Sequence, residues 1–166
     1  MSVRNLDELF LHELKDVLDA ERQITKALPK MIKAAENEDL QAGFEEHLSV
    51  TEEQIGRLET IFKTLDKAAR GKHCHGMEGL LKEGDEMIKE EDPGPVLDAA
   101  MIAAAQKVEH YEIAAYGTLV EYAKLLGMDD AVELLQTTLA EEKETDEKLS
   151  EIASEINLVA QTQGAE

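Results

Sequence analysis

The sequence is poor in the residues that favour strands, interrupt helices or form covalent cross-links. Its 166 residues include no Trp, three Phe, three Tyr, three Pro and one Cys. A shortage of aromatic residues disfavours a sheet, whereas the abundant Ala, Leu, Glu, Lys and Met lose little side-chain freedom in a helix. The single Cys74 excludes an internal disulfide, as expected in a reducing compartment. We therefore expect one all-α domain.

Positive charge and long apolar runs are also scarce. Lys and Arg total 17 against 37 Asp and Glu, so the formal net charge is -20. Such a surface repels nucleic acids and anionic membranes and favours cations. No apolar run approaches the ~20 residues of a membrane span, and the N-terminus lacks the basic and apolar regions of a signal peptide. We expect a cytoplasmic protein that binds neither nucleic acid nor membrane.

Apolar residues recur with helical spacing along four long segments. They predict helices over residues 3–36, 40–69, 97–126 and 129–156, with a short helix over 77–88 in the connection between the second and third. Two helical hairpins joined by a long connection form the topology of ferritin-like proteins. We predict an all-α, ferritin-like four-helix bundle over residues 1–159, with one long crossover that carries the short helix. Residues 160–166 are predicted to form a polar C-terminal tail.

A polar residue interrupts each apolar stripe near its middle. The interruptions are Glu21, Thr51 with Gln54 beside it, Glu112 and Glu142. In an antiparallel hairpin, residues equally far from the turn lie at the same height. By this count Glu21 is level with Gln54, and Glu112 is level with Glu142. Four interruptions at one height predict a polar layer inside the bundle.

Glu109 and Asp146 extend this layer by one helical turn. Carboxylates gathered in a poorly solvated interior repel one another, and a divalent cation removes that cost. Oxygen-rich sites favour Mg, Mn and Fe. We therefore expect one or two iron or manganese ions, held by Glu21, Glu109, Glu112, Glu142 and Asp146. In the alternative, the acids are protonated, paired with one another or with Lys or Arg, and solvated by buried water.

Three histidines and an amide are further candidates. His47 lies on the face of Thr51, where it is either a ligand or a hydrogen-bonded core histidine. Gln54 offers a neutral amide oxygen, which is a weak metal ligand. We therefore expect it to support the ligands from outside the coordination sphere. His73, Cys74 and His75 stand together, but they provide too few ligands for a tetrahedral site, so a buried thiol with solvated histidines is favoured.

Several segments distributed along the chain form a specific set of motifs. They are Leu9–Asp16, Ala20–Glu21, Ala27–Met31, Phe44–Leu48, Thr51, Gln54, Arg57–Leu58, Lys107–Gly117 and Leu139–Asp146. Together they resemble the YciE/YciF family of bacterial stress-induced ferritin-like proteins. The resemblance covers almost the whole chain and implies a ferritin-like or rubrerythrin-like bundle, a homodimer and a metal centre, with no established reaction.

One departure from the di-iron pattern affects the expected chemistry. Ferritins and rubrerythrins carry Glu-x-x-His on two helices, and that motif is absent from this sequence. Thr51 with Gln54, and Glu142 with Thr145, stand in its place. We expect a metal-binding protein that oxidises Fe(II) or consumes peroxide, if it turns over any substrate. The alternative is a non-catalytic structural or interaction protein whose buried acids fix the register of the bundle or of a dimer.

Overall fold

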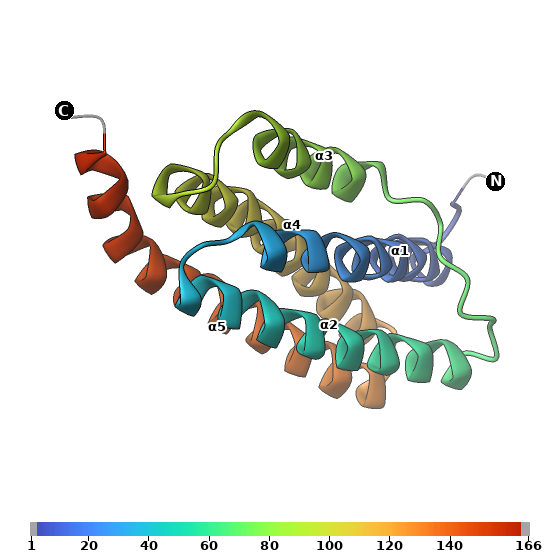
Figure 1. The fold of residues 1–166 in the computed structure, drawn as a ribbon. Coiled ribbons are helices and arrows are strands. Elements are labelled where there is room, and N and C mark those ends of the chain that lie inside the picture. The colour runs from blue at the N-terminus through green and yellow to red at the C-terminus, as the bar shows by residue number, and fades with distance from the viewer. Residues whose placement is uncertain (1–2, 164–166) are drawn as a thin grey trace.

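A computed structural model describes residues 3–163 of the chain, and Figure 1 shows its path through five helices. The predicted all-α, ferritin-like four-helix bundle is confirmed. Its helices are α1 (Leu6–Ala34), α2 (Glu38–Thr64), α3 (His75–Glu90), α4 (Pro95–Leu125) and α5 (Asp129–Thr162).

Local sequence signals set the helix ends. The side chains of Asn5 and Asn37 accept hydrogen bonds from the backbone N–H groups of Glu8 and Leu40, which caps α1 and α2. Pro95 occupies the first turn of α4, where its missing N–H costs nothing. Gly127 has φ +68°, the left-handed conformation that closes α4 before α5 begins.

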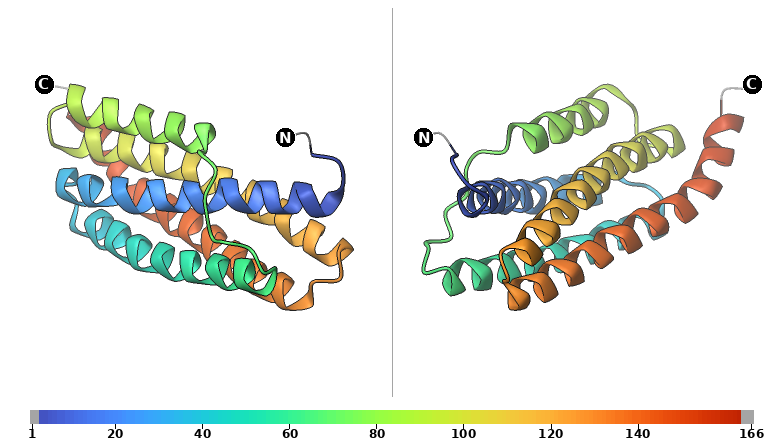
Figure 2. Two further views of the ribbon diagram at one scale, coloured as in Figure 1. Left: turned by 90° about the vertical axis from the view of Figure 1, so that its right-hand side faces the viewer. Right: turned by 180° about the vertical axis from the view of Figure 1, so that it is seen from behind.

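Two antiparallel hairpins form the bundle. The α1 helix packs against α2, and α4 packs against α5. The hairpins meet through contacts of α2 with α5 and of α1 with α4. The short crossover helix α3 lies outside the bundle against α4 and α1, as Figure 2 shows from two sides. The predicted crossover helix is therefore confirmed.

The apolar core is divided into two clusters by a polar layer. One cluster surrounds Phe44 and Met101, and the other surrounds Phe10 and Tyr116. The polar residues that interrupt the helical stripes lie between these clusters along the helices. The sequence interruptions thus mark one continuous layer across the bundle.

The helix expected over 40–69 ends already at Thr64, and the last helix also differs from its prediction. It continues past Ile156 to Thr162, so residues 160–162 are helical, and residues 164–166 of the predicted tail lie outside the described part. The division into a domain over 1–159 and a tail over 160–166 stays a prediction. Among residues 3–163, no helix combines the length and apolarity that crossing a bilayer requires.

Candidate metal centre

Four helices contribute polar side chains to the middle of the bundle. Their exposed fractions range from 0% to 5%. They are Glu21 from α1, His47, Thr51 and Gln54 from α2, Glu109 and Glu112 from α4, and Glu142 from α5. The structure therefore gathers six of the seven predicted site residues, with Thr51 beside them.

The closest group consists of His47, Glu109, Glu112 and Glu142. One ligand atom from each lies within 4.8 Å of the others. Two ligands on opposite sides of an ion at about 2.2 Å are roughly 4.4 Å apart, so the group is close to the size of a coordination sphere. The imidazole Nε2 of His47 lies 3.4 Å from Oε1 of Glu109.

Most polar atoms of this layer have no hydrogen-bond partner in the protein other than another residue of the layer. In the described residues, nine buried side-chain atoms lack one, and all nine belong to the layer. They are both carboxylate oxygens of Glu109, Glu112 and Glu142, Oε2 of Glu21, Nε2 of His47 and Oε1 of Gln54. Buried polar atoms are nearly always paired, so their concentration at one place requires an explanation.

The partners that do exist orient the layer. The Tyr116 hydroxyl donates a hydrogen bond to Oε1 of Glu21. Gln54 donates through Nε2 to Glu141 at 3.2 Å, which leaves its carbonyl oxygen free. The hydroxyl of Thr51 donates to the backbone oxygen of His47 at 2.8 Å, as a helical threonine commonly does.

Burial and mutual repulsion raise the pKa values of these acids. Burial is the largest cause at each acid, and it raises the pKa of Glu21 to about 8 and that of Glu142 to about 7. The pKa values of Glu109 and Glu112 lie well above their usual range, because burial is joined by the charge of Glu142. Burial also lowers the pKa of His47 to about 4, so the imidazole is neutral and can act as a ligand.

Asp98 shows how a structural buried acid differs from these residues. It is 2% exposed, yet its two oxygens accept hydrogen bonds from the backbone N–H groups of Glu36 and Asn37 at 3.0 and 2.9 Å. It thereby ties α4 to the turn between α1 and α2. The fold satisfies this acid completely and leaves the acids of the central layer unsatisfied.

Asp146 differs from its predicted place. Its side chain is 21% exposed, and its carboxylate contacts His110 at 3.2 Å and Gln106 at 3.3 Å, both on α4. These contacts hold it at the edge of the layer. His47 is the residue that lies beside Glu109, with 3.4 Å between Nε2 and Oε1.

One supporting pair was not predicted from the sequence. Arg57 of α2 forms a two-pronged ion pair with Glu141 of α5, with distances of 2.6 and 2.7 Å. Because Gln54 donates to the same carboxylate, the pair fixes the amide that faces the layer. Glu141 lies in an acidic run that resembles a solvated helix surface, so its spacing gave no signal of this role.

A cavity of about 510 Å³ reaches the layer from the side of the crossover helix. It lies between α1, α3 and α4, and its wall is mainly apolar, with Ile24, Leu81 and Val108 among the lining residues. His47 and Glu109 line the same cavity. The cavity thus extends to two residues at the edge of the central layer.

The five helices and the buried cluster of acids with one histidine define a ferritin-like bundle protein. Comparisons with known proteins give the family. The chain belongs to the family described as "Domain of unknown function (DUF892)", which matches residues 5–162. Similarity to protein YciF confirms the resemblance to the YciE/YciF family.

Two relatives illustrate the similarity. Protein YciF of Escherichia coli K12 is 46% identical over 155 residues, which cover 92% of this chain and 93% of YciF. The crystal structure of YciF, described as a stress protein, superposes with a TM-score of 0.89 at 43% identity, covering 93% of this chain and 98% of YciF. YcfI of Rhodopseudomonas palustris, described as a candidate structural protein, gives a TM-score of 0.87 at 50% identity, covering 90% and 95% of the two chains.

Proposed function

We propose that this protein binds one or two iron or manganese ions in the central layer of its bundle. Glu21, Glu109, Glu112 and Glu142 would supply carboxylate oxygens, and His47 would supply one nitrogen. The observation that carries the proposal is the convergence of nine unpartnered buried atoms in one layer. An unpaired buried carboxylate is costly, and cation binding would remove that cost.

The donor set favours these metals over softer ones. Four carboxylates and one imidazole form an oxygen-rich site without a thiolate, which suits Mn and Fe. His47 is neutral because burial lowers its pKa to about 4. Gln54 presents its carbonyl oxygen and is held by Glu141, so it would accompany the ligands or complete their set.

The site would support oxidation of Fe(II) by oxygen or peroxide. Bound iron supplies a one-electron couple between Fe(II) and Fe(III). The protein contributes carboxylates that tolerate both oxidation states, and the Tyr116 hydroxyl orients Glu21. The apolar cavity favours the entry of a small uncharged oxidant over that of a charged substrate.

A structural role is the second candidate, because several polar contacts fix the helices to one another. Arg57 joins Glu141 between α2 and α5, and Asp98 joins α4 to the first hairpin turn. These contacts would fix the register of the bundle without a metal. The homodimer that the family resemblance implies also stays a proposal, which light scattering tests.

Metal content distinguishes the two candidates. Glu112→Gln keeps the shape of the side chain but removes the negative charge that a metal ligand needs. After anaerobic loading with Fe(II) or Mn(II) and desalting, we expect stoichiometric metal in the wild type and its loss in the variant. Glu52→Gln, an exposed change on α2, is the matched control. Equal metal content in Glu112→Gln and wild type would reject the assignment.

A further inference from the structure

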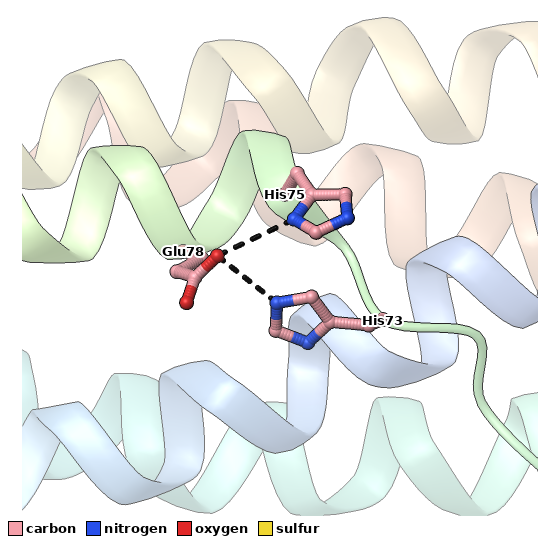
Figure 3. Close-up of side chains that lie close together, drawn as sticks. All are labelled: His73, His75 and Glu78. Atoms are coloured by element: carbon pink, nitrogen blue, oxygen red, sulfur yellow. Dashed lines mark hydrogen bonds and ion pairs between the residues drawn. The ribbon is translucent and has the colours of Figure 1, made fainter.

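A second group of metal-ligating side chains lies on the surface, at the start of α3. Figure 3 shows the side chains of His73, His75 and Glu78 directed toward one another. One ligand atom from each lies within 4.8 Å of the others, and all three residues are exposed. His73 belongs to the loop before α3, whereas His75 and Glu78 lie on the first turn of the helix. This group is distinct from the buried layer.

The spacing of the ligand atoms suits a tetrahedral ion. Oε2 of Glu78 lies 3.0 Å from Nε2 of His73 and 3.4 Å from Nδ1 of His75. Ligands bound at about 2.0–2.1 Å to a tetrahedral ion are roughly 3.3 Å apart. These two separations bracket this value.

A carboxylate faces the other nitrogen of His73. Nδ1 of His73 lies 3.6 Å from Oδ2 of Asp19 on α1, whereas Nε2 faces Glu78. Ligating histidines commonly direct their second nitrogen at a carboxylate, which fixes the ring and increases its basicity. Asp19 is itself held, because the backbone N–H of Cys74 donates to it at 2.8 Å and Gln23 donates at 2.7 Å.

The backbone between the two histidines is anchored. Cys74 is 1% exposed and directs its thiol inward, where Sγ lies 3.0 Å from the hydroxyl of Tyr111. Its backbone oxygen accepts a hydrogen bond from Gln23 at 3.1 Å. A buried residue between two exposed histidines thus fixes the points from which both rings project, and such preorganisation lowers the entropy lost on binding.

We propose that His73, His75 and Glu78 form a surface site for a divalent transition-metal ion that prefers imidazole ligands, with Zn²⁺ as the favoured ion. Two nitrogens and one oxygen leave a fourth position for water, as in open zinc sites. The donors differ from the oxygen-rich buried layer, so the two sites would select different metals.

The local charges favour a cation overall. The N-terminus of α3 carries a partial positive charge that opposes a cation, but Glu78 and Asp19 supply two negative charges beside the site. Glu78 also lines the cavity that reaches His47 and Glu109. A bound ion would link the loop before α3 to the first turn of α3, at the edge of that cavity.

Zinc titration of the Glu112→Gln protein tests the site with the buried layer weakened. We expect calorimetry to show one Zn²⁺ per chain at this site. Adding His75→Ala should weaken it by more than about a hundredfold, since loss of an orienting partner alone costs roughly 10–100-fold. Adding Asp19→Asn, which removes the charge of the orienting partner, should weaken zinc binding by roughly 10–100-fold. Adding His110→Ala, which removes an exposed histidine of α4 paired with Asp146, should change nothing.

A second measurement needs no variant. In the wild-type protein, Zn²⁺ should shift the imidazole NMR signals of His73 and His75 and leave those of His12 and His110 in place. Equal zinc affinity with and without His75→Ala, or shifts confined to His47, would overturn the proposal. The iron and manganese content of Glu112→Gln is a separate readout, so failure of this site and failure of the buried one are distinguishable.

Discussion

Nε2 of His47 lies 3.4 Å from Oε1 of Glu109, and neither atom has a hydrogen-bond partner among the described residues. The two side chains come from α2 and α4, which belong to different hairpins. A neutral imidazole and a carboxyl group with a raised pKa therefore face each other in the buried interior. The arrangement suits two ligands of a common ion.

The metal-free protein should lose stability as the pH rises from about 5 to 8. The pKa of Glu21 rises from 4.5 to about 8 on folding and that of Glu142 rises to about 7. The stability that these two acids contribute is fully present below their pKa in the unfolded chain. It is lost as the pH rises through their pKa values in the folded protein. Each pKa shift corresponds to a few kcal/mol in the free energy of unfolding, at about 1.4 kcal/mol per unit of pKa. Chemical denaturation in the presence of EDTA measures the trend.

His47 has the opposite effect on the pH dependence of stability, since its pKa falls from 6.5 to about 4 on folding. Its contribution is present above pH 6.5 and is lost as the pH falls toward 4. One histidine opposes four acids, so the acids should prevail above pH 6.5. Saturating Mn(II) should flatten the decline, because the ion replaces the protons. Stability that is independent of pH in the metal-free protein would contradict the burial of these charges.

Tyr116→Phe should destabilise the protein without changing its fold. The substitution removes the hydroxyl that donates to Glu21 and leaves Oε1 unpaired in the core. We expect a loss of about 1–3 kcal/mol in the free energy of unfolding of the metal-free protein. The pKa of Glu21 should rise further, because Tyr116 lowers it. Urea denaturation at pH 5 and pH 8 measures both effects, and Tyr122→Phe provides a less buried comparison.

Asp98→Ala should separate stability from metal binding. The variant leaves the backbone N–H groups of Glu36 and Asn37 without their acceptor and should cost about 1–3 kcal/mol per buried group that remains unsatisfied. Its iron or manganese content should equal that of the wild type. A loss of metal as complete as that of Glu112→Gln would indicate that metal content merely follows stability.

Ala104→Leu should slow oxidation of Fe(II) while leaving metal content unchanged. Ala104 lines the cavity that reaches His47 and Glu109, and a leucine there would occupy part of its 510 Å³. Stopped-flow absorbance after mixing the Fe(II)-loaded protein with oxygen measures the rate, which we expect to fall several-fold. Ala103→Leu, on the exposed side of the same helix, is the matched control. Equal rates for both variants would argue against the cavity as the route.

The sequence predicts the central layer well because the prediction needs only helical spacing and distance from each turn. Within each hairpin they set Glu21 level with Gln54 and Glu112 level with Glu142, and all four side chains are buried in the structure. Asp146 departs from this expectation because it lies beside His110 and Gln106 of α4, whose side chains hold its carboxylate at the edge of the layer. Helical spacing and distance from the turn do not predict those contacts.

Contacts that depend on tertiary placement were not predictable. The Arg57–Glu141 pair requires the relative position of α2 and α5, and helical periodicity does not fix it. Glu78 joins His73 and His75 only because α3 begins at His75 and the preceding loop is anchored on Asp19. The sequence predicted a buried thiol with solvated histidines, and Cys74 is buried while both histidines are exposed. It did not single out Glu78, because helical spacing does not define where α3 begins.

Anomalous diffraction tests the central claim most directly. Crystals grown with Fe(II) or Mn(II) and measured above and below the absorption edge of the metal should show a peak among the side chains of His47, Glu109, Glu112 and Glu142. Carboxylates paired with one another or with water, and no peak among them in metal-saturated crystals, would contradict the account.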